Sequence, residues 1–127
     1  MVKIRKAVVS DLKGISGLTK KHSRKGHMLY RPEMEIALHV RDYFVARENG
    51  KLAGCCALKI WSVAAAEIYA WAVDENCRKR GIGTALVRKC VKEAGKLGLK
   101  KIVALTYQHP LIKKLGFKKT NRIPQIM

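Results

Sequence analysis

The sequence predicts an α/β domain built on a mixed β-sheet. Residues 68–73 form an almost unbroken apolar run, as expected for a strand buried on both faces. From Ile82 to near Gly98, apolar residues recur at spacings of three and four, which indicates a long helix with one buried face. Asn49-Gly50 is the strongest hairpin signal in the chain and lies between two further strand patterns. A hairpin followed by a helical crossover is typical of a sheet with both antiparallel and parallel neighbours.

The first third of the chain is predicted to hold one strand and two helices. Residues 2–9 form the strand, and Ser10 offers an N-cap for a short helix whose apolar positions end at Leu18. The polar, unpatterned segment 20–30 is predicted to be a loop. A second helix opens at residue 31, where an early proline loses no hydrogen bond, and runs to about Arg41.

The rest of the chain continues the sheet. Strands are predicted at residues 43–48, 51–61, 66–73, 101–105 and 117–120. The long helix precedes the strand at 101–105, and a short helix over 110–115 precedes the last strand. The predicted order is strand, helix, helix, three strands, helix, strand, helix, strand. This order gives a sheet of about six strands in a single domain that covers residues 1–127.

Length and composition fit one small domain. At 127 residues and 48% apolar content, the chain can bury one core and is too short for two. No stretch has the length and apolarity of a membrane span, and the N-terminus lacks the apolar core of a signal peptide, so we expect a cytoplasmic protein. The four cysteines show no Cys-x-x-Cys spacing and three of them fall in apolar patterns, which favours buried reduced thiols over a metal site.

The chain is strongly basic. Its 27 Lys and Arg against 9 Asp and Glu give a formal net charge of +18, enough to attract any polyanion, whether nucleic acid, an acidic surface or a phosphorylated coenzyme. The basic residues are dispersed along the chain, however, and a lysine-rich solvated surface is also common in proteins from hot environments. Aromatic residues make up only 6%, without the basic-aromatic interleaving that stacks bases. Nucleic-acid binding is therefore kept only as an alternative to an enzymatic function.

The turn before the long helix has the chemistry of a phosphate site. Gly81 and Gly83 let the chain turn with its amides uncovered, and the first N–H groups of a helix have no partner within it. These groups and the helix dipole favour an anion, and residues 78–80 add positive charge beside them, although a solvated turn is their structural alternative. The Walker pattern fails because no Gly-Lys-Ser/Thr follows, and the dinucleotide pattern fails because Leu86 replaces its third glycine.

What remains is Arg78-x-x-Gly81-x-Gly83 directly after Ala72-Val73-Asp74, and it resembles the acetyl-coenzyme A signature of the GCN5-related N-acetyltransferases (GNAT). The resemblance extends to Lys114-Leu115-Gly116-Phe117. It implies the GNAT fold, acetyl-coenzyme A as cosubstrate and a primary amine as acceptor. Because the family splays its fourth and fifth strands apart, the backbone N–H of Val73 is expected to face the thioester or pantetheine. The residues implied in coenzyme binding are Trp71, Ala72, Val73, Arg78, Lys79, Arg80, Gly81, Ile82, Gly83 and Thr84.

Within that family, the sequence is most similar to amino-acid N-acetyltransferases of the N-acetylglutamate synthase kind. The resemblance implies a free amino acid, such as glutamate, as acceptor, with a protein N-terminus or lysine as the alternative. It also implies substrate contacts at Arg31, which matches a basic position that contacts substrate carboxylates, and at Tyr69, where relatives often carry Arg. The matching pieces are Lys25-Gly26-His27-Met28-Leu29-Tyr30-Arg31, Asp42-Tyr43-Phe44-Val45-Ala46, Gly54-Cys55-Cys56-Ala57-Leu58, Ala66-Glu67-Ile68, and Leu105-Thr106-Tyr107 ahead of Leu115-Gly116-Phe117.

Acyl transfer to an amine needs a group that accepts a proton and an N–H that polarises the thioester oxygen. Glu67 is the candidate base, because it is the only acid between Glu48 and Asp74 and lies in an otherwise apolar strand. It also matches the strand-four glutamate that acts as base in the histone acetyltransferase branch of the family. The alternative for Glu67 is a structural carboxylate paired with a lysine.

The general acid that protonates the leaving thiolate is less clearly marked. Many family members carry a tyrosine four residues before the glycine of the Gly-Phe pair, and here that position is Ile112. Tyr107 is the candidate substitute, and a structural tyrosine is its alternative. The missing tyrosine also suggests a coenzyme-binding sensor without activity as an alternative function.

The C-terminus departs from the family pattern. The sequence stops at Ile123-Pro124-Gln125-Ile126-Met127, where relatives continue into a full final strand. The resemblance therefore implies a last strand that is truncated, or that a partner chain completes in a homodimer.

Overall fold

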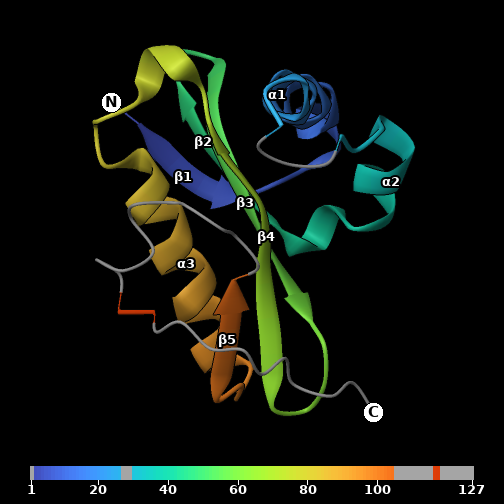
Figure 1. The fold of residues 1–127 in the computed structure, drawn as a ribbon, viewed down its shortest axis with the longest axis vertical. Coiled ribbons are helices and arrows are strands. Elements are labelled where there is room, and N and C mark those ends of the chain that lie inside the picture. The colour runs from blue at the N-terminus through green and yellow to red at the C-terminus, as the bar shows by residue number, and fades with distance from the viewer. Residues whose placement is uncertain (1, 27–29, 105–115, 118–127) are drawn as a thin grey trace.

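A five-stranded sheet forms the centre of the computed structural model, which describes residues 2–26, 30–104 and 116–117. The strand order is β1-β2-β3-β4-β5, and all neighbours are antiparallel except β4 and β5, which are parallel (Figure 1). This mixed sheet confirms the predicted fold class. The elements are β1 (Lys3–Lys6), α1 (Leu12–Arg24), α2 (Glu33–Leu38), β2 (Tyr43–Glu48), β3 (Lys51–Ile60), β4 (Ala65–Val73), α3 (Ile82–Lys96) and β5 (Lys101–Ala104), with 3₁₀ turns at Val9–Asp11, Val40–Asp42 and Glu75–Cys77.

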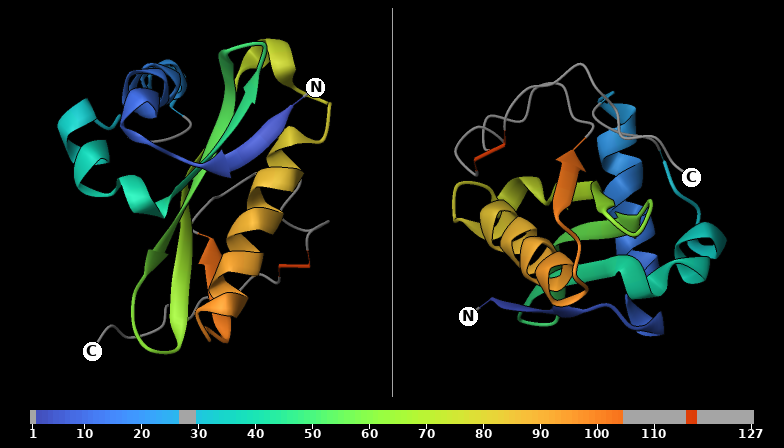
Figure 2. Two further views of the ribbon diagram at one scale, coloured as in Figure 1. Left: turned by 180° about the vertical axis from the view of Figure 1, so that it is seen from behind. Right: turned by 90° about the horizontal axis from the view of Figure 1, so that it is seen from below.

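The sheet separates two helical layers. Helix α3 covers one face, and α1 and α2 cover the other (Figure 2). Successive strand residues point to opposite faces, so Phe44 packs in the cluster with Leu86 of α3 while Val45 packs with Ile15 of α1. Each fully buried side chain of this kind contributes roughly 1.5–3 kcal/mol. None of the described helices has the length and apolarity needed to cross a membrane.

Most predicted elements are present with small shifts. Strand β2 has the predicted bounds, and the hairpin turn that follows it has φ +52° at Asn49 and +76° at Gly50, as a two-residue hairpin turn requires. Strand β1 is shorter than predicted because the chain turns into a 3₁₀ helix at Val9. The predicted helix at 110–115 and most of the predicted last strand, with its completion by a partner chain, lie outside the described residues.

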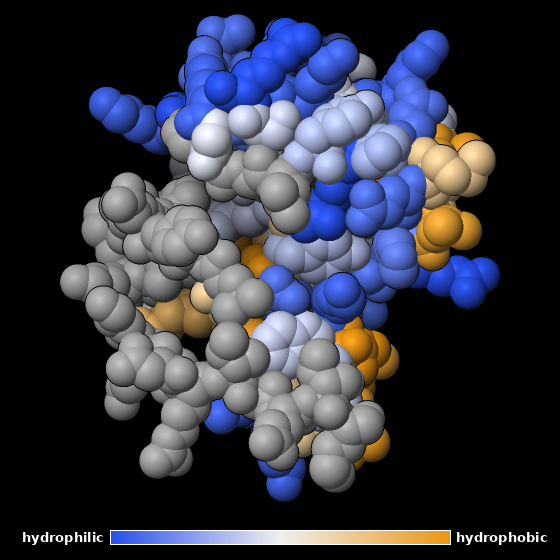
Figure 3. All heavy atoms as spheres, turned by 45° about the vertical axis from the view of Figure 1, so that its right-hand side comes forward, coloured by the Kyte–Doolittle hydropathy of each residue, from blue (hydrophilic) through white to orange (hydrophobic). Residues whose placement is uncertain are grey.

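The two N-terminal helices differ from the prediction. Helix α1 runs to Arg24, so the loop predicted over residues 20–30 was wrong for residues 20–24. The buried face of α1 continues through polar residues, Thr19 and His22, and the Nδ1 atom of His22 lies 3.0 Å from the Leu18 carbonyl oxygen. Hydrophilic side chains gather over the upper part of this side of the molecule, where α1 lies (Figure 3). Helix α2 is shorter than predicted, since the chain leaves it for a separate 3₁₀ turn before β2.

A buried carboxylate ties the N-terminal turn to the sheet. Asp11 accepts hydrogen bonds from Arg5 Nη1 at 2.7 Å, Arg47 Nε at 2.9 Å and the Val8 N–H at 2.8 Å. Burial by itself raises the pKa of Asp11, but these hydrogen bonds outweigh it and lower the pKa to about 2. Ser10, predicted to cap α1, lies instead within the 3₁₀ turn.

Strand β4 contains a bulge at Ala70. The register against β3 shifts by one residue here, so that Cys56 lies opposite both Ala70 and Trp71. Ala70 has φ +49°, a left-handed conformation that costs a residue with a Cβ roughly 1–2 kcal/mol. Because of the extra residue, Tyr69 and Ala70 both belong to the cluster under α1 and α2, whereas Trp71 packs toward α3.

We predict that acid unfolding depends on Asp11. Its pKa of about 2 in the folded protein lies below the usual value of roughly 4, so the carboxylate contributes about 2 kcal/mol that is complete above about pH 5 and is lost as the pH falls toward 2. Asp11→Asn should therefore lower the free energy of unfolding by about 2 kcal/mol at pH 7 and have little effect near pH 2. Urea unfolding followed by circular dichroism measures both values.

The matched control for this prediction is Glu93→Gln, which removes a carboxylate from α3. It should leave the pH dependence of unfolding unchanged. If Asp11→Asn retained the full acid dependence of the original protein, the role given to this carboxylate would be wrong.

Candidate active site

The N-terminus of α3 presents uncovered backbone N–H groups. Gly81 has φ +80°, which glycine adopts without strain, and its carbonyl accepts the first helical hydrogen bond from the Ala85 N–H at 3.0 Å. The N–H groups of Ile82, Gly83 and Thr84 precede that bond and have no partner within the helix. The first turn, all of it described, contains no acidic residue. This end of α3 therefore has the positive potential and free donors that suit a phosphate.

The three basic residues before α3 differ in their surroundings. Arg78 and Lys79 are exposed, and neither forms an ion pair with another described residue. Arg80 instead forms a two-pronged contact with Glu48 at the end of β2, in which Nη1 donates to Oε1 at 2.7 Å and Nη2 donates to Oε2. The hydrogen bonds from Arg80 lower the pKa of Glu48. Two of the three predicted cations are thus unengaged in the described structure.

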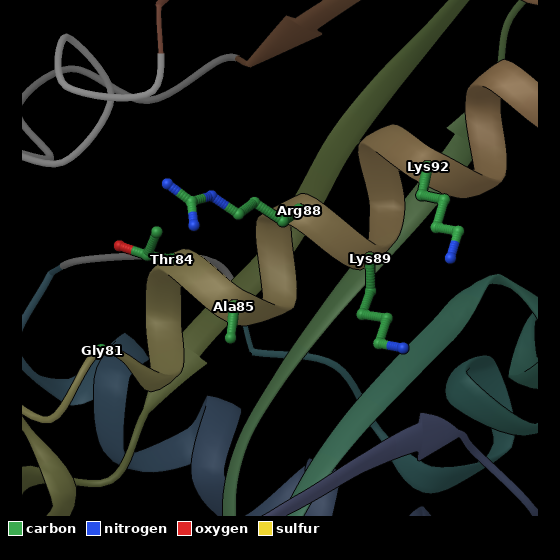
Figure 4. A pocket seen from close by; sticks show the side chains of 6 residues that line it. All are labelled: Gly81, Thr84, Ala85, Arg88, Lys89 and Lys92. Carbon is green, nitrogen blue, oxygen red and sulfur yellow. The ribbon is translucent and has the colours of Figure 1, made fainter.

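A basic groove continues from this turn along α3. It has a volume of about 460 Å³, and Arg88 extends back along the helix toward Thr84 (Figure 4). Half of the lining residues are cationic and none is acidic, so the groove favours anions. Sequence analysis missed the cations of the groove, although Thr84, Arg88 and Lys92 recur at the spacing of one helical face. The lining residues are Gly81, Thr84, Ala85, Arg88, Lys89 and Lys92.

Strand β4 meets the first turn of α3 after the bulge. The indole N–H of Trp71 donates to the Gly83 carbonyl at 3.1 Å, which ties the strand to the helix. Ala72 is buried and packs toward α1 and α2. The Asp74 N–H donates to a carbonyl of β3 at 2.8 Å, and successive N–H groups along a strand point to opposite edges. The N–H of Val73 therefore points away from β3, toward the edge of β4 that faces β5. Among the described residues, β5 pairs only with the first four residues of β4, so it does not reach Val73.

Glu67 lies before the bulge, half-buried on the face of β4 that is covered by α1 and α2. Its Oε1 accepts a hydrogen bond from the indole N–H of Trp61 at 3.0 Å. Lys59 lies directly opposite on β3, yet Glu67 forms no ion pair with any lysine among the described residues. The structural alternative of a lysine-paired carboxylate therefore has no support in the described part of the chain.

Arg31 and Tyr69, which are far apart in the sequence, are in contact. The guanidinium carbon of Arg31 lies 4.9 Å from the centroid of the Tyr69 ring, a cation–π distance. Arg31 Nη1 is 3.6 Å from Glu35 Oε1, and its Nε is buried without a hydrogen-bond partner among the described residues. The Tyr69 hydroxyl donates to Asp42 Oδ2 at 2.8 Å. Burial, and then this hydrogen bond, raise the pKa of Tyr69 well above its usual value, so the hydroxyl stays protonated.

Three of the four cysteines are buried in the core. Cys55, Cys56 and Cys90 are buried free thiols, as the sequence predicted. Burial raises the pKa of Cys55 to about 12 and raises that of Cys56 well above its usual value, which keeps both protonated. Within the described residues, no group of three or more His, Cys, Asp and Glu side chains is arranged to hold a metal ion.

Comparison with known proteins identifies the family. The sequence profile of the acetyltransferase (GNAT) family matches residues 15–117. The chain belongs to the GNAT acetyltransferase family. It is an N-acetyltransferase by family, and acetyl-coenzyme A is the cosubstrate of GNAT enzymes, as the resemblance of Arg78-x-x-Gly81-x-Gly83 implied.

Two kinds of relative are similar over most of the chain. An uncharacterized N-acetyltransferase of Chlorobaculum tepidum is 35% identical over 119 residues, which cover 94% of this chain and 77% of that protein. The solved structure of Rv2747 from Mycobacterium tuberculosis in complex with CoA and NLQ has a TM-score of 0.91 and 28% identity, covering 97% of this chain and 75% of that chain. The structural likeness, which covers 97% of this chain, confirms the GNAT fold.

A third relative belongs to the amino-acid acetyltransferase branch. N-acetylglutamate synthase from Neisseria gonorrhoeae, solved in complex with coenzyme A and N-acetyl-glutamate, has a TM-score of 0.82 and 25% identity, covering 91% of this chain and 27% of that chain. The chain likewise spans 24% of the length of the amino-acid acetyltransferases of Neisseria meningitidis that it matches. The predicted similarity to this branch is confirmed.

The structure brings the predicted residues of this GNAT domain into two groups. Trp71 and the glycine turn meet at the start of α3, while Arg31 and Tyr69 meet on the other face of the sheet beside Glu67. Tyr107, the candidate general acid, lies outside the described residues, and so does the position at Ile112. Sequence analysis missed the partners of two site residues, Trp61 for Glu67 and Asp42 for Tyr69, because both contacts depend on strand and helix packing.

Proposed function

We propose that this GNAT domain, acting as one unit in the cytoplasm, transfers the acetyl group of acetyl-coenzyme A to the amine of a free amino acid, glutamate or a close analogue. One observation carries the proposal: Arg31 stacks on Tyr69, on the same face of β4 as Glu67. A guanidinium suits a carboxylate, and a carboxylate suits an ammonium that must lose a proton. An acid and a cation on one face therefore match the two ends of an α-amino acid.

The start of α3 is the proposed coenzyme site. The N–H groups of Ile82, Gly83 and Thr84 would donate to the pyrophosphate, and Arg78 and Lys79 would add charge. The basic groove along α3 continues from these groups, and its cations would add positive charge for the phosphates of the coenzyme. The N–H of Val73, which points away from β3, would polarise the thioester oxygen as negative charge develops there.

Glu67 is the proposed general base. It would accept the proton that the ammonium loses before the nitrogen forms its bond to the thioester carbon, and the carbon–sulfur bond then breaks to release the thiolate. Since Trp61 occupies Oε1, the other carboxylate oxygen is the one to accept this proton. Tyr107 stays a candidate for protonating the thiolate.

Arg31 is the proposed carboxylate contact. Its side chain is held between Glu35 and the Tyr69 ring, and its buried Nε has no partner in the described chain. A buried unpaired donor is costly, so a substrate oxygen that accepts from it would recover that free energy. The relatives support the class of acceptor, since N-acetylglutamate synthase from Neisseria gonorrhoeae is solved with N-acetyl-glutamate.

The first prediction concerns coenzyme binding. Thr84→Asp places a carboxylate at the third helical position, where it favours the helix but repels pyrophosphate. We expect an unchanged or higher melting temperature and acetyl-coenzyme A affinity that is lower by roughly 100-fold, measured by calorimetric titration. Thr84→Asn has the same shape without the charge and should bind nearly as well as the original protein. Equal affinity of the two variants would remove the site from this turn.

The second prediction concerns the base. Glu67→Gln should keep acetyl-coenzyme A affinity and lower kcat by roughly 100-fold or more, because the amide cannot accept the proton. A thiol-release assay with a panel of amines measures kcat, and calorimetry measures the affinity. The pH–rate profile should also lose its acidic limb. Full activity of this variant would exclude Glu67 as the base, and an inactive original protein that binds the coenzyme would indicate a sensor.

The third prediction concerns the acceptor. Arg31→Gln should raise the KM for glutamate by roughly tenfold or more with little change in kcat, because a carboxylate contact contributes mainly to binding. Arg41→Gln removes the same charge from the exposed neighbouring 3₁₀ turn and should leave the KM unchanged. If the protein acetylates peptides and not free glutamate, the acceptor is a protein amine and the amino-acid assignment is wrong.

A further inference from the structure

Trp61 donates a hydrogen bond from its indole to Glu67, the proposed base. We propose that Trp61 is a positioning residue for Glu67: its N–H fixes one carboxylate oxygen so that the other faces the amine. This inference rests on the proposed function, because it assumes that Glu67 accepts the proton. The contact that carries it is the hydrogen bond from Trp61 Nε1 to Glu67 Oε1, at 3.0 Å.

The loop between β3 and β4 holds Trp61 in place. The backbone N–H of Trp61 donates to the Ala65 carbonyl at 2.9 Å. The Ser62 hydroxyl accepts hydrogen bonds from the backbone N–H groups of Ala64 and Ala65 at 3.1 and 3.2 Å. Trp61 continues β3 opposite Ala65, so it is the diagonal neighbour of Glu67 on the same face of the hairpin. At that separation, an aromatic side chain reaches its partner across the strands. The indole is therefore aimed by the hairpin itself.

The hydrogen-bond partner of Glu67 is informative because the chain is so basic. Among 27 Lys and Arg, Lys59 lies directly across from Glu67 in the strand pairing, where an ion pair would be expected. The described structure instead gives the carboxylate a neutral donor. An indole has a single N–H and no acceptor, so it orients the carboxylate and cannot take its proton.

The described strands place two other titratable groups on the same face as Glu67. Lys59 faces it from β3, and Tyr69 follows it on the same face of β4 with its hydroxyl committed to Asp42. On β5, Val103 pairs with Glu67 and carries no titratable group. Trp61 is thus the one described residue that forms a hydrogen bond to the carboxylate.

Trp61→Phe tests the role, because it keeps an aromatic ring in the loop and removes the N–H donor together with the five-membered ring of the indole. We expect kcat to fall by roughly tenfold, the typical effect of losing a hydrogen bond to a charged group, while the KM and Kd for acetyl-coenzyme A stay unchanged. The acidic limb of the pH–rate profile should move to higher pH, because the lost N–H had favoured the ionised carboxylate. Circular dichroism and thermal unfolding confirm that the variant is folded.

A double-mutant cycle separates positioning from a structural role. In the Glu67→Gln background, Trp61→Phe should cause no further loss of kcat, since the indole acts through the carboxylate. Ser62→Ala loosens the same loop without touching the indole and is expected to have a smaller effect than Trp61→Phe. An equal loss in both backgrounds, or the same loss from Ser62→Ala, would overturn the positioning role.

The cycle also distinguishes this inference from the proposed function. If Glu67→Gln is inactive and Trp61→Phe retains full kcat and an unshifted pH profile, Glu67 stands as the base and only the role of Trp61 is overturned. If Glu67→Gln is itself fully active, the base assignment fails first, and the role of Trp61 fails with it.

Discussion

The left-handed conformation of Ala70 is the constraint on which the site depends. A single extra residue in β4 changes which side chains face which helical layer. Before the bulge, Glu67 and Tyr69 face α1 and α2, and after it Trp71 faces α3. One strand therefore supplies the candidate base and substrate contact on one side and anchors the helix start on the other. The strain of the bulge is small against the apolar burial that holds β4 between β3 and β5 in the sheet.

The placement of the acids shapes the electrostatics of the protein. All nine acidic residues lie in the described part of the chain. Four of them form ion pairs with lysine or arginine there: Asp11 with Arg5 and Arg47, Glu35 with Arg31, Glu48 with Arg80, and Glu75 with Lys25. Glu67 and Asp74 are different, since their hydrogen bonds come from neutral donors. The large excess of positive charge remains available at the surface, including the groove along α3. Such a field attracts anionic molecules, including acetyl-coenzyme A, before they make contact.

The β3–β4 hairpin links stability and chemistry. Its strands pair antiparallel along most of their length, and its loop is closed by hydrogen bonds among residues 61–65. A group that must abstract a proton works best when its own geometry is already fixed before the substrate arrives. Strand pairing fixes the geometry of Glu67, the proposed base, and the packing of Arg31 on Tyr69 fixes the geometry of the proposed substrate contact.

The sequence by itself determined the features that depend on residues adjacent in the chain. The bounds of β2, the turn at Asn49-Gly50 and the start of α3 after Gly81 follow from local backbone preferences and from periodicity, so they could be predicted. The spacing of Gly81 and Gly83 in the turn before α3 could likewise be read from adjacent residues. These signals need no knowledge of what packs against them.

Only the tertiary structure decided the features that depend on distant partners. Alanine carries no signal for a left-handed bulge, so the strain at Ala70 comes from the pairing of β4 with β3. The polar end of α1 is helical because the core buries Thr19 and His22, which a polarity pattern cannot reveal. The contact of Trp61 with Glu67 and that of Arg31 with Tyr69 require a strand register and a helix packing that no local preference encodes, because the free energy that fixes them belongs to the folded sheet as a whole.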